Sequence, residues 1–248
     1  MYLMRTILFL FCFQAFFVNV QAQSPFVSPY TLNYKLDVPV ATAGFGLNFA
    51  YFLLNRKTEV LTEPYILALD RSNIPRIDRP AAFNWSGRAA LGSDILMFSS
   101  IAAPSFLFLD RNIRKDWLKV GAIWAETMAL NTGITNLTKV LVKRTRPYVY
   151  NPNAPAHFKT EKDAQYSFFS GHTSVTASMT FMSAKIYSDY NPGSKALPYV
   201  WAAAAIVPAA TAFLRWRAGK HFFSDVLVGY ITGAAIGFIV PHLHKIIR

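Results

Sequence analysis

Cysteine is nearly absent: the one cysteine among 248 residues is Cys12, which lies in an apolar segment, residues 7–20. Arg5 precedes that segment and a small-residue cleavage pattern follows it, so residues 1–22 are predicted to be a secretory signal peptide. The mature chain would then contain no cysteine, which excludes disulfide bonds even in an exported protein. Phe11 stands where a lipoprotein signal needs a small residue, so lipidation of Cys12 is excluded as well.

Acidic residues are also scarce, with 13 Asp and Glu against 25 Lys and Arg, a net charge of +12. The basic residues form no long run, so nucleic-acid binding explains them poorly, whereas anionic lipid and phosphate explain them well. The sequence contains no internal repeat and no low-complexity tract. Hydrophobic residues make up 53% of the chain and its mean hydropathy is +0.25, which favours a membrane protein.

Apolar stretches of helical length dominate the second half of the chain. A membrane-spanning helix needs about 20 apolar residues, and two of the stretches reach that length. We therefore predict an all-α helical bundle, integral to a membrane, with five to six apolar helices and an active site at one membrane face. The five stretches are residues 95–109, 118–137, 174–187, 197–214 and 223–243.

The N-terminal third has a different character. Residues 39–54 are apolar but contain two glycines and an asparagine, and we expect them to pack as an interfacial or re-entrant helix. The predicted organisation is thus a signal peptide, then an N-terminal loop and interfacial helix region over residues 23–93, then a helical core over residues 94–248.

Three short clusters of polar residues lie between the apolar stretches. Lys and Arg bind phosphate oxygens through charge-assisted hydrogen bonds, and a pair of histidines can supply a nucleophile and a general acid. His221 and Asp225 are four residues apart, so on a helix the carboxylate would share a face with the imidazole and fix its tautomer. The clusters are Lys139 with Arg146-Pro147, then Ser170-Gly171-His172, then Arg215 with His221 and Asp225.

These clusters resemble the type 2 phosphatidic acid phosphatase superfamily, whose pattern is K-x6-RP, PSGH and SR-x5-H-x3-D. Here the three segments read KVLVKRTRP, FSGH and LRWRAGKHFFSD. Two positions depart from the pattern, because Phe169 replaces the proline and Leu214 replaces the serine. Neither position carries a charge or transfers a proton, so these departures bear on substrate fit more than on chemistry. The resemblance covers about residues 118–240.

The resemblance implies a phosphohistidine mechanism. His221 would be the nucleophile, Asp225 would orient it, and His172 would protonate the leaving oxygen and then activate water. No metal and no cofactor would be needed, because the cations are side chains of the chain itself. Five further residues would hold the phosphate oxygens: Lys139, Arg146, Ser170, Gly171 and Arg215.

The alternation of helices with motifs predicts that all three motifs lie on one side of the membrane. An exported start followed by five spans would put them on the periplasmic or exterior face of a bacterial cytoplasmic membrane. The short basic loop at residues 111–116 would then stay inside, as positively charged loops do. If residues 39–54 cross the membrane and the signal is cleaved, the site would instead face the cytoplasm.

Several functions fit this site. The leading one is a membrane lipid phosphatase acting on a polyprenyl diphosphate, phosphatidic acid, phosphatidylglycerol phosphate or a lipid A phosphate. The main alternative is a soluble, exported, non-specific acid phosphatase with the same fold. A vanadate-dependent haloperoxidase or phosphotransferase and a non-catalytic membrane scaffold are weaker alternatives. No nucleic-acid partner is expected, and no protein partner can be inferred.

Some charged residues outside these assignments have other expected places. Glu126 lies in an apolar run and is expected to face the bundle interior. His242 and His244 lie beside basic residues near the C-terminus and are expected to be interfacial rather than catalytic. Lys143 and Arg144 lie within the variable part of the first motif, where they are placed to touch substrate or lipid headgroups.

Overall fold

The computed structural model describes residues 27–246, so the predicted signal peptide lies outside the described residues. Within that range the fold is all-helical, as predicted, and no strand is present. Short 3₁₀ turns join the helices at the loops. The α-helices are α1 (Tyr34–Arg56), α2 (Glu63–Leu67), α3 (Gly87–Ala102), α4 (Arg111–Lys115), α5 (Trp117–Val142), α6 (Ala156–Lys159), α7 (Gly171–Tyr190), α8 (Leu197–Arg217) and α9 (Phe223–Leu243).

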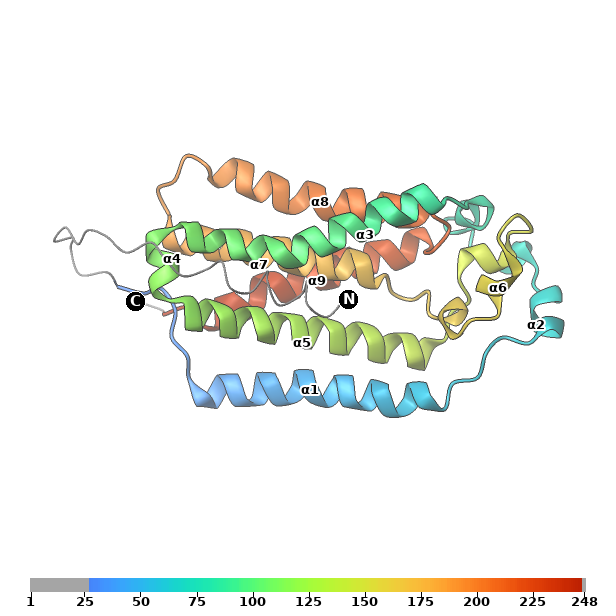
Figure 1. The fold of residues 1–248 in the computed structure, drawn as a ribbon, viewed down its shortest axis with the longest axis horizontal. Helices are drawn as coiled ribbons and strands as arrows, with labels where there is room; N and C mark the ends of the chain where they lie inside the picture. Colours follow the sequence, from blue (N-terminus) through green and yellow to red (C-terminus); the bar gives the residue numbers. More distant parts are fainter. Residues whose placement is uncertain (1–26, 247–248) are drawn as a thin grey trace, which may run out of the picture.

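The long helices run side by side along one axis, with α7 at the centre (Figure 1). Helices α3, α5, α8 and α9 all contact α7, which is rich in serine and threonine despite its central place. Its buried hydroxyls bond within the protein: Ser174 Oγ donates to Asn131 Oδ1 at 2.6 Å, and Ser178 Oγ donates to the Val175 carbonyl. A polar central helix is therefore compatible with an apolar bundle surface.

Helices α7 and α9 approach each other closely through a stripe of glycines. A methyl group at Gly229, Gly233 or Gly237 of α9 would lie 2.6, 2.1 and 2.2 Å from a carbonyl oxygen of α7. The glycines and the carbonyls repeat every four residues, so they lie on matching faces of the two helices. Small residues allow backbones to pack this closely. The three carbonyls belong to Ser170, Ser174 and Ser178.

Residues 39–54 form part of one continuous helix, α1, that lies lengthwise along α5 (Figure 1). The interfacial or re-entrant placement of this helix relative to a membrane stays a prediction. The contact is close, because Gly44 faces Ala129 and Asn48 Nδ2 donates to the Ala129 carbonyl at 2.9 Å. The opposite face of α1 is exposed and apolar, with Phe45 70% and Phe49 61% exposed.

Four helices of the described chain are long and apolar enough to cross a membrane. They include three of the five predicted stretches and add α1. Helices α5 and α7 do not qualify, because their buried polar residues lower the hydropathy of both. The four candidate spans are Tyr34–Arg56, Gly87–Leu109, Leu197–Arg217 and Phe223–Leu243.

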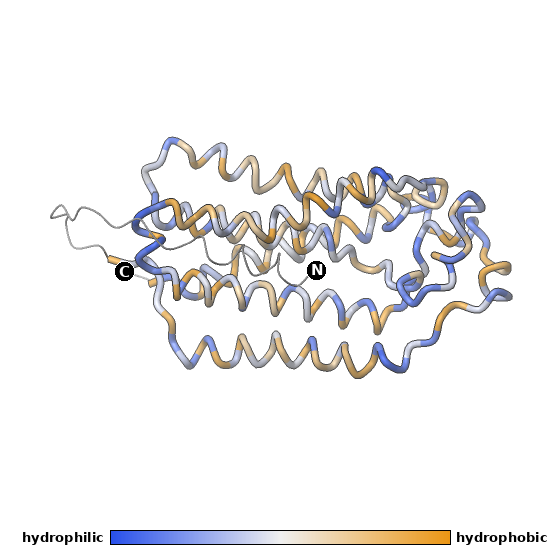
Figure 2. The backbone as a smooth tube through the Cα atoms, viewed as in Figure 1, coloured by the Kyte–Doolittle hydropathy of each residue, from blue (hydrophilic) through white to orange (hydrophobic). Residues whose placement is uncertain are grey.

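Polar residues gather at the two ends of the bundle (Figure 2). At one end, the segments after α1 and after α5 pack together over the helix ends. Tyr148 and Val149 are buried there against Leu61 and Trp85, which joins two loops that are far apart in the sequence. The opposite end holds α4 and the turn after α9 (Figure 1).

Candidate active site

The three sequence motifs come together at the loop-covered end of the bundle (Figure 1). Lys139 lies in the last turn of α5, Ser170 caps the first turn of α7, and Arg215 lies in the last turn of α8. His221 lies in the short turn between α8 and α9. The antiparallel arrangement of consecutive helices therefore brings all the predicted site segments to one place.

The turn that carries His221 depends on Gly219. This residue has φ = +69° and ends α8, a left-handed conformation that favours glycine. A methyl group at Gly219 would lie 2.1 Å from the Asn84 carbonyl oxygen. His221 is thus not part of a helix, contrary to the geometry assumed for the pair with Asp225.

His221 is completely buried, and both ring nitrogens have partners. Its Nδ1 lies 2.7 Å from the Ser167 carbonyl oxygen, which can only accept, so Nδ1 carries the proton. The lone pair is therefore on Nε2, which lies 3.0 Å from Arg146 Nη1. This tautomer leaves Nε2 as the nitrogen available for chemistry, at the cationic side of the site.

The surroundings of His221 hold it in the neutral form. Burial lowers the pKa of its imidazole well below the usual value, and the charges of Arg146, Arg215 and Lys139 lower it further. Arg146 contacts this histidine directly, and Arg215 and Lys139 are near enough for their charges to act on it. A neutral imidazole next to fixed cations is a nucleophile directed at an anion.

Asp225 lies near His221, but the hydrogen bond that orients the imidazole comes from Ser167 instead. The distance from His221 Nδ1 to Asp225 Oδ2 is 3.7 Å. Asp225 Oδ2 accepts from Ser167 Oγ at 2.5 Å and from the Phe222 amide at 2.9 Å. The carboxylate thus fixes the Ser167 segment and the start of α9, both of which flank His221.

Sequence reasoning missed Asp78 and gave Arg144 a different place. Arg144 Nη1 donates to Asp225 Oδ1 at 2.5 Å, and Nη2 donates to Asp78 Oδ2 at 2.7 Å. Asp78 in turn accepts from the amide and the hydroxyl of Ser224, at 2.9 and 2.6 Å. Arg144 therefore lies between two carboxylates behind the site, and its guanidinium is committed to protein partners rather than to a headgroup.

Arg146 is the most fully bonded of the predicted phosphate-binding residues. Its Nη2 donates to Asp163 Oδ1 at 2.7 Å, and its Nε donates to the Asp163 carbonyl at 2.8 Å. Burial alone would raise the pKa of Asp163, but the charges of Arg146 and Lys139 outweigh it and lower the pKa to about 2. Asp163 is half exposed, so this carboxylate lies at the rim and partners the cation of the site.

The other predicted phosphate ligands lie beside Arg146 and form, together with it, a cradle for an anion. Arg215 is buried, and its Nε has no hydrogen-bond partner within the described chain. Lys139 Nζ lies beside Gly171, since a methyl group there would be 3.3 Å from it. The Ser170 hydroxyl bonds with the Thr173 hydroxyl at 2.9 Å and caps α7, whose N-terminus favours anions. A buried cation with an unpaired donor suits a phosphate oxygen.

His172 pairs with Asp94, a carboxylate that no sequence motif indicated. His172 Nε2 lies 2.8 Å from Asp94 Oδ1, and Arg215 Nη1 lies 3.5 Å from the same oxygen. Asp94 comes from α3, outside the three motifs, and directly precedes the predicted apolar stretch at residues 95–109. Burial and the charges of Arg215, Lys139 and Arg146 lower the pKa of His172 to about 2, so its imidazole is neutral in this structure. Asp94 is the carboxylate in contact with this imidazole, and a negative charge beside a histidine favours its protonated form.

Lys220, directly before His221, lies among aromatic rings. Its Nζ is 4.7 Å from the ring centre of Tyr148, 4.8 Å from Phe158 and 5.6 Å from Trp85. Such contacts attract a cation. They connect the His221 turn to both covering loops, and the Lys220 carbonyl accepts from Arg146 Nη1 at 2.8 Å.

An apolar pocket of about 380 Å³ lies next to the site, between α8 and α9. Trp216, which follows Arg215, and Phe223, which begins α9, are among its lining residues. No charged side chain lines it. The pocket is therefore suited to hydrocarbon rather than to phosphate.

Comparison with known proteins places these observations in a family. The family model described as the PAP2 superfamily matches residues 120–247, just over half of the chain and all three motifs. A protein of Porphyromonas gingivalis named lipid A 4'-phosphatase is 27% identical over 146 residues, which cover 58% of this chain and 56% of that relative. The chain thus spans little more than half the length of this relative. No solved structure matches the chain.

Proposed function

Since the chain belongs to the PAP2 superfamily, we propose that it is a membrane lipid phosphatase that works through a phosphohistidine. The substrate would be a phosphate monoester or diphosphate of a lipid. Four apolar helices and a relative named for lipid A support a bacterial membrane protein. That relative's name puts lipid A phosphates first among the substrates to test, ahead of polyprenyl diphosphate, phosphatidic acid and phosphatidylglycerol phosphate.

The observation that carries this proposal is the orientation of His221. Its Nδ1 proton is held by the Ser167 carbonyl, and its Nε2 lone pair lies on the side of Arg146. A phosphate bound by Arg146, Arg215 and Lys139 would present its phosphorus to this nitrogen. The Nε2–P bond would form as the bond from phosphorus to the lipid oxygen breaks.

His172 would give its proton to that lipid oxygen. The negative charges of the bound phosphate and of Asp94 would stabilise the protonated imidazole against the burial and the cations that lower its pKa. In the second step the now neutral His172 would accept a proton from water. The water oxygen would attack phosphorus and release His221. The cations that bind the phosphate also stabilise the charge that develops in both steps, without a metal ion.

The pocket between α8 and α9 supports a lipid substrate. It is lined by apolar side chains, among them Trp216, which follows Arg215 in the sequence. An acyl or prenyl chain would lie there while its phosphate occupies the cradle. The exposed apolar face of α1 weighs against the soluble acid phosphatase, because a chain dissolved in water would leave that face uncovered.

We further propose that the site faces the periplasm or exterior, supported by the basic loop of α4 at the opposite end. If α1 crosses the membrane, it begins at that opposite end and reaches the site end at Arg56 (Figure 1). An exterior site then requires residue 33 on the cytoplasmic side. A cleaved signal peptide and an exterior site would be mutually exclusive in that case.

The proposal is tested by phosphate release from the purified protein in detergent, across the four lipid classes and a water-soluble phosphomonoester. We expect release from at least one lipid class at a rate at least tenfold above the soluble ester, inhibition by vanadate and retention of activity in EDTA. Equal rates on lipid and soluble esters would favour the non-specific phosphatase. Activity that needs an added divalent metal would refute the metal-free chemistry.

A further inference from the structure

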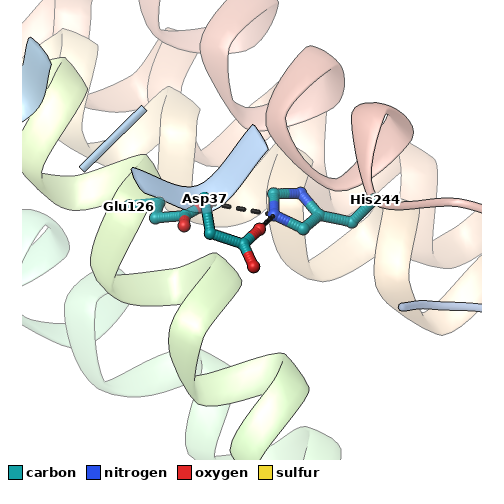
Figure 3. A group of neighbouring side chains, drawn as sticks. All are labelled: Asp37, Glu126 and His244. Atoms are coloured by element: carbon teal, nitrogen blue, oxygen red, sulfur yellow. Dashed lines mark hydrogen bonds and ion pairs between the residues drawn. The ribbon is translucent and has the colours of Figure 1, made fainter. Parts of the chain in front are cut away.

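A second cluster of titratable side chains lies at the end of the bundle away from the active site. It consists of Asp37 in the first turn of α1, Glu126 in α5 and His244 just after α9 (Figure 3). One ligand atom from each lies within 4.8 Å of the others. Between residues 27 and 246, this is the one group of three such residues that meets this distance.

The hydrogen bonding of His244 determines which nitrogen faces the carboxylates. Its Nδ1 lies 2.8 Å from the Val240 carbonyl oxygen, so Nδ1 carries the proton and donates it. Nε2 then faces Asp37 Oδ1 at 2.9 Å and Glu126 Oε2 at 3.1 Å. A neutral imidazole would thus direct a lone pair at two carboxylate oxygens. A positive charge therefore belongs at this place, either as a proton on Nε2 or as a metal ion bound by all three side chains.

The two carboxylates have no other cation in the described chain. Their one charged partner is His244, and neither forms an ion pair with a lysine or an arginine. Glu126 is 93% buried, since 7% of it is exposed, and its Oε2 accepts no hydrogen bond of good geometry. A buried carboxylate without a hydrogen-bond donor is costly unless a cation is bound to it.

We propose that His244, Asp37 and Glu126 bind one divalent transition-metal ion of the zinc type, with water as the fourth ligand. One imidazole with two carboxylates suits zinc better than magnesium or calcium, which prefer oxygen alone. Bonds of about 2.0–2.2 Å to each ligand place ligand atoms roughly 3.3 Å apart in a tetrahedron. The two observed distances to His244 Nε2, 2.9 and 3.1 Å, need to widen by only a few tenths of an ångström, and the two carboxylate oxygens lie within 4.8 Å of each other.

The surroundings of His244 also fit a metal ligand. Metal-bound histidines usually donate their second ring nitrogen to a carbonyl or carboxylate, as His244 does to Val240. The site would join three separate elements: α1, α5 and the end of the chain after α9. Because α1 otherwise contacts mainly α5, the ion would fasten its first turn to the rest of the bundle.

The test is metal content of the full-length chain, purified in detergent with a histidine-free affinity tag. After equilibration with Zn²⁺ and removal of free ion, we expect about one Zn²⁺ per chain in the wild type. His244→Gln and Glu126→Gln should lower Zn²⁺ affinity at least tenfold. His242→Gln is the matched control, because His242 is exposed two residues away and outside the cluster, and it should bind as the wild type does.

Co²⁺ gives a readout that does not depend on the variants being stable. In the wild type it should produce the visible absorption of a four-coordinate nitrogen and oxygen site, and one equivalent of Zn²⁺ should remove it. A wild type that retains no Zn²⁺ would overturn the proposal and would mean that a proton on Nε2 serves as the cation. Equal Zn²⁺ binding in folded His244→Gln would overturn it as well.

Discussion

Asp94 Oδ1 lies 2.8 Å from His172 Nε2, which joins a carboxylate of α3 to a histidine of α7. The two residues are 78 positions apart, and only one of them belongs to a sequence motif. The same carboxylate oxygen lies 3.5 Å from Arg215 Nη1, so Asp94 contacts both the proposed general acid and a proposed phosphate ligand.

We expect Asp94→Asn to slow substrates with poor leaving groups more than those with good ones. The amide cannot stabilise a proton on His172, and an alkoxide needs that proton to leave whereas a nitrophenolate does not. The expected loss in kcat is about tenfold or more for a lipid phosphate and smaller for nitrophenyl phosphate. It should not exceed the about 10²–10⁴-fold that a general acid itself contributes, because Asp94 acts through His172. Asp70→Asn is the control, because Asp70 is exposed and bonds only locally to Ser72. An equal loss on both substrates would show that Asp94 does not act through His172.

We expect His221→Ala to abolish turnover and any covalent phosphoenzyme. Covalent nucleophiles contribute several kcal/mol, so the rate should fall by at least about 10³-fold. The check is trapping of labelled phosphate on acid-quenched protein together with steady-state rates. His157→Ala is the control, because His157 is exposed in α6 and has no assigned role. More than a tenth of the wild-type rate in His221→Ala would rule out the nucleophile assignment.

The acid side of the pH profile should lack a titration near the ordinary histidine value of about 6.5. The pKa of His221 is lowered, so its neutral, nucleophilic form persists as the pH falls below that value, and protonation removes the nucleophile only at much lower pH. The measurement is kcat/KM from pH 4.5 to 8, corrected for the second ionisation of the phosphate near about 6. An enzyme group that titrates between 6 and 7 and whose protonation stops the reaction would contradict this neutral state.

Arg144→Gln should reduce both stability and rate, although the side chain does not contact the phosphate cradle. It would leave Asp78 and Asp225 without their cation behind His221. Because Arg144 is partly exposed, we expect a loss of roughly 1–3 kcal/mol, less than the about 3–5 kcal/mol for a fully buried pair. Arg217→Gln, at an exposed position, is the control. A double-mutant cycle with Asp78→Asn should show coupling, and additive effects would contradict the shared network.

Gly233→Ala should destabilise the bundle, because its methyl group would lie 2.1 Å from the Ser174 carbonyl. Overpacking typically costs about 1–3 kcal/mol, and contact with a backbone atom should put this change at the upper end. Gly121→Ala is the matched control: nothing lies within 4 Å of that position, and alanine should stabilise α5 by about 0.5–1 kcal/mol. Thermal unfolding in detergent measures both, and equal melting temperatures would contradict the close contact.

Membrane orientation can be read from two single cysteines in a Cys12→Ser background. Asn153→Cys is exposed at the site end, and Gly193→Cys is exposed at the other end with open space around it. With an exterior site, an impermeant thiol reagent should label the first and not the second in intact spheroplasts. The opposite pattern would place the site in the cytoplasm. Labelling of both would indicate that no membrane separates the two ends.

The sequence predicted the helical class and the meeting of three motifs, because apolar stretches alternate with the motifs along the chain. It did not predict Asp78, Asp94 or Asp163, each of which contacts the site from a segment without a motif. Single contacts between distant segments depend on tertiary packing, which leaves no periodic signal in the sequence. Asp225 was expected to orient His221 directly, but the turn at Gly219 places the imidazole against the Ser167 carbonyl.

The packing of α1 on α5 was not predicted for a related reason. The two glycines and the asparagine of residues 39–54 favoured an interfacial or re-entrant helix over a span, whereas Gly44 and Asn48 contact α5 in the structure. Helix α7 was expected to be apolar, although its serine and threonine hydroxyls bond inside the bundle. In both helices the polar or small residues serve helix packing. Composition alone does not show whether such residues pack against a neighbouring helix or make the segment a poor membrane span.

The glycine stripe of α9 restricts sequence change in one part of this protein and leaves other parts free to vary. The stripe holds the backbones of α7 and α9 in close contact. These two helices begin at Gly171 and Phe223, next to the residues assigned to the phosphate chemistry. The loops that cover the site and the pocket beside Trp216 are fixed by side chains instead. Sequence drift in those regions can alter which lipid is accepted while the reaction centre keeps its shape. Relatives with the same motifs can therefore differ in substrate. We expect the sequences of their loops, rather than of their motifs, to differ with the substrate.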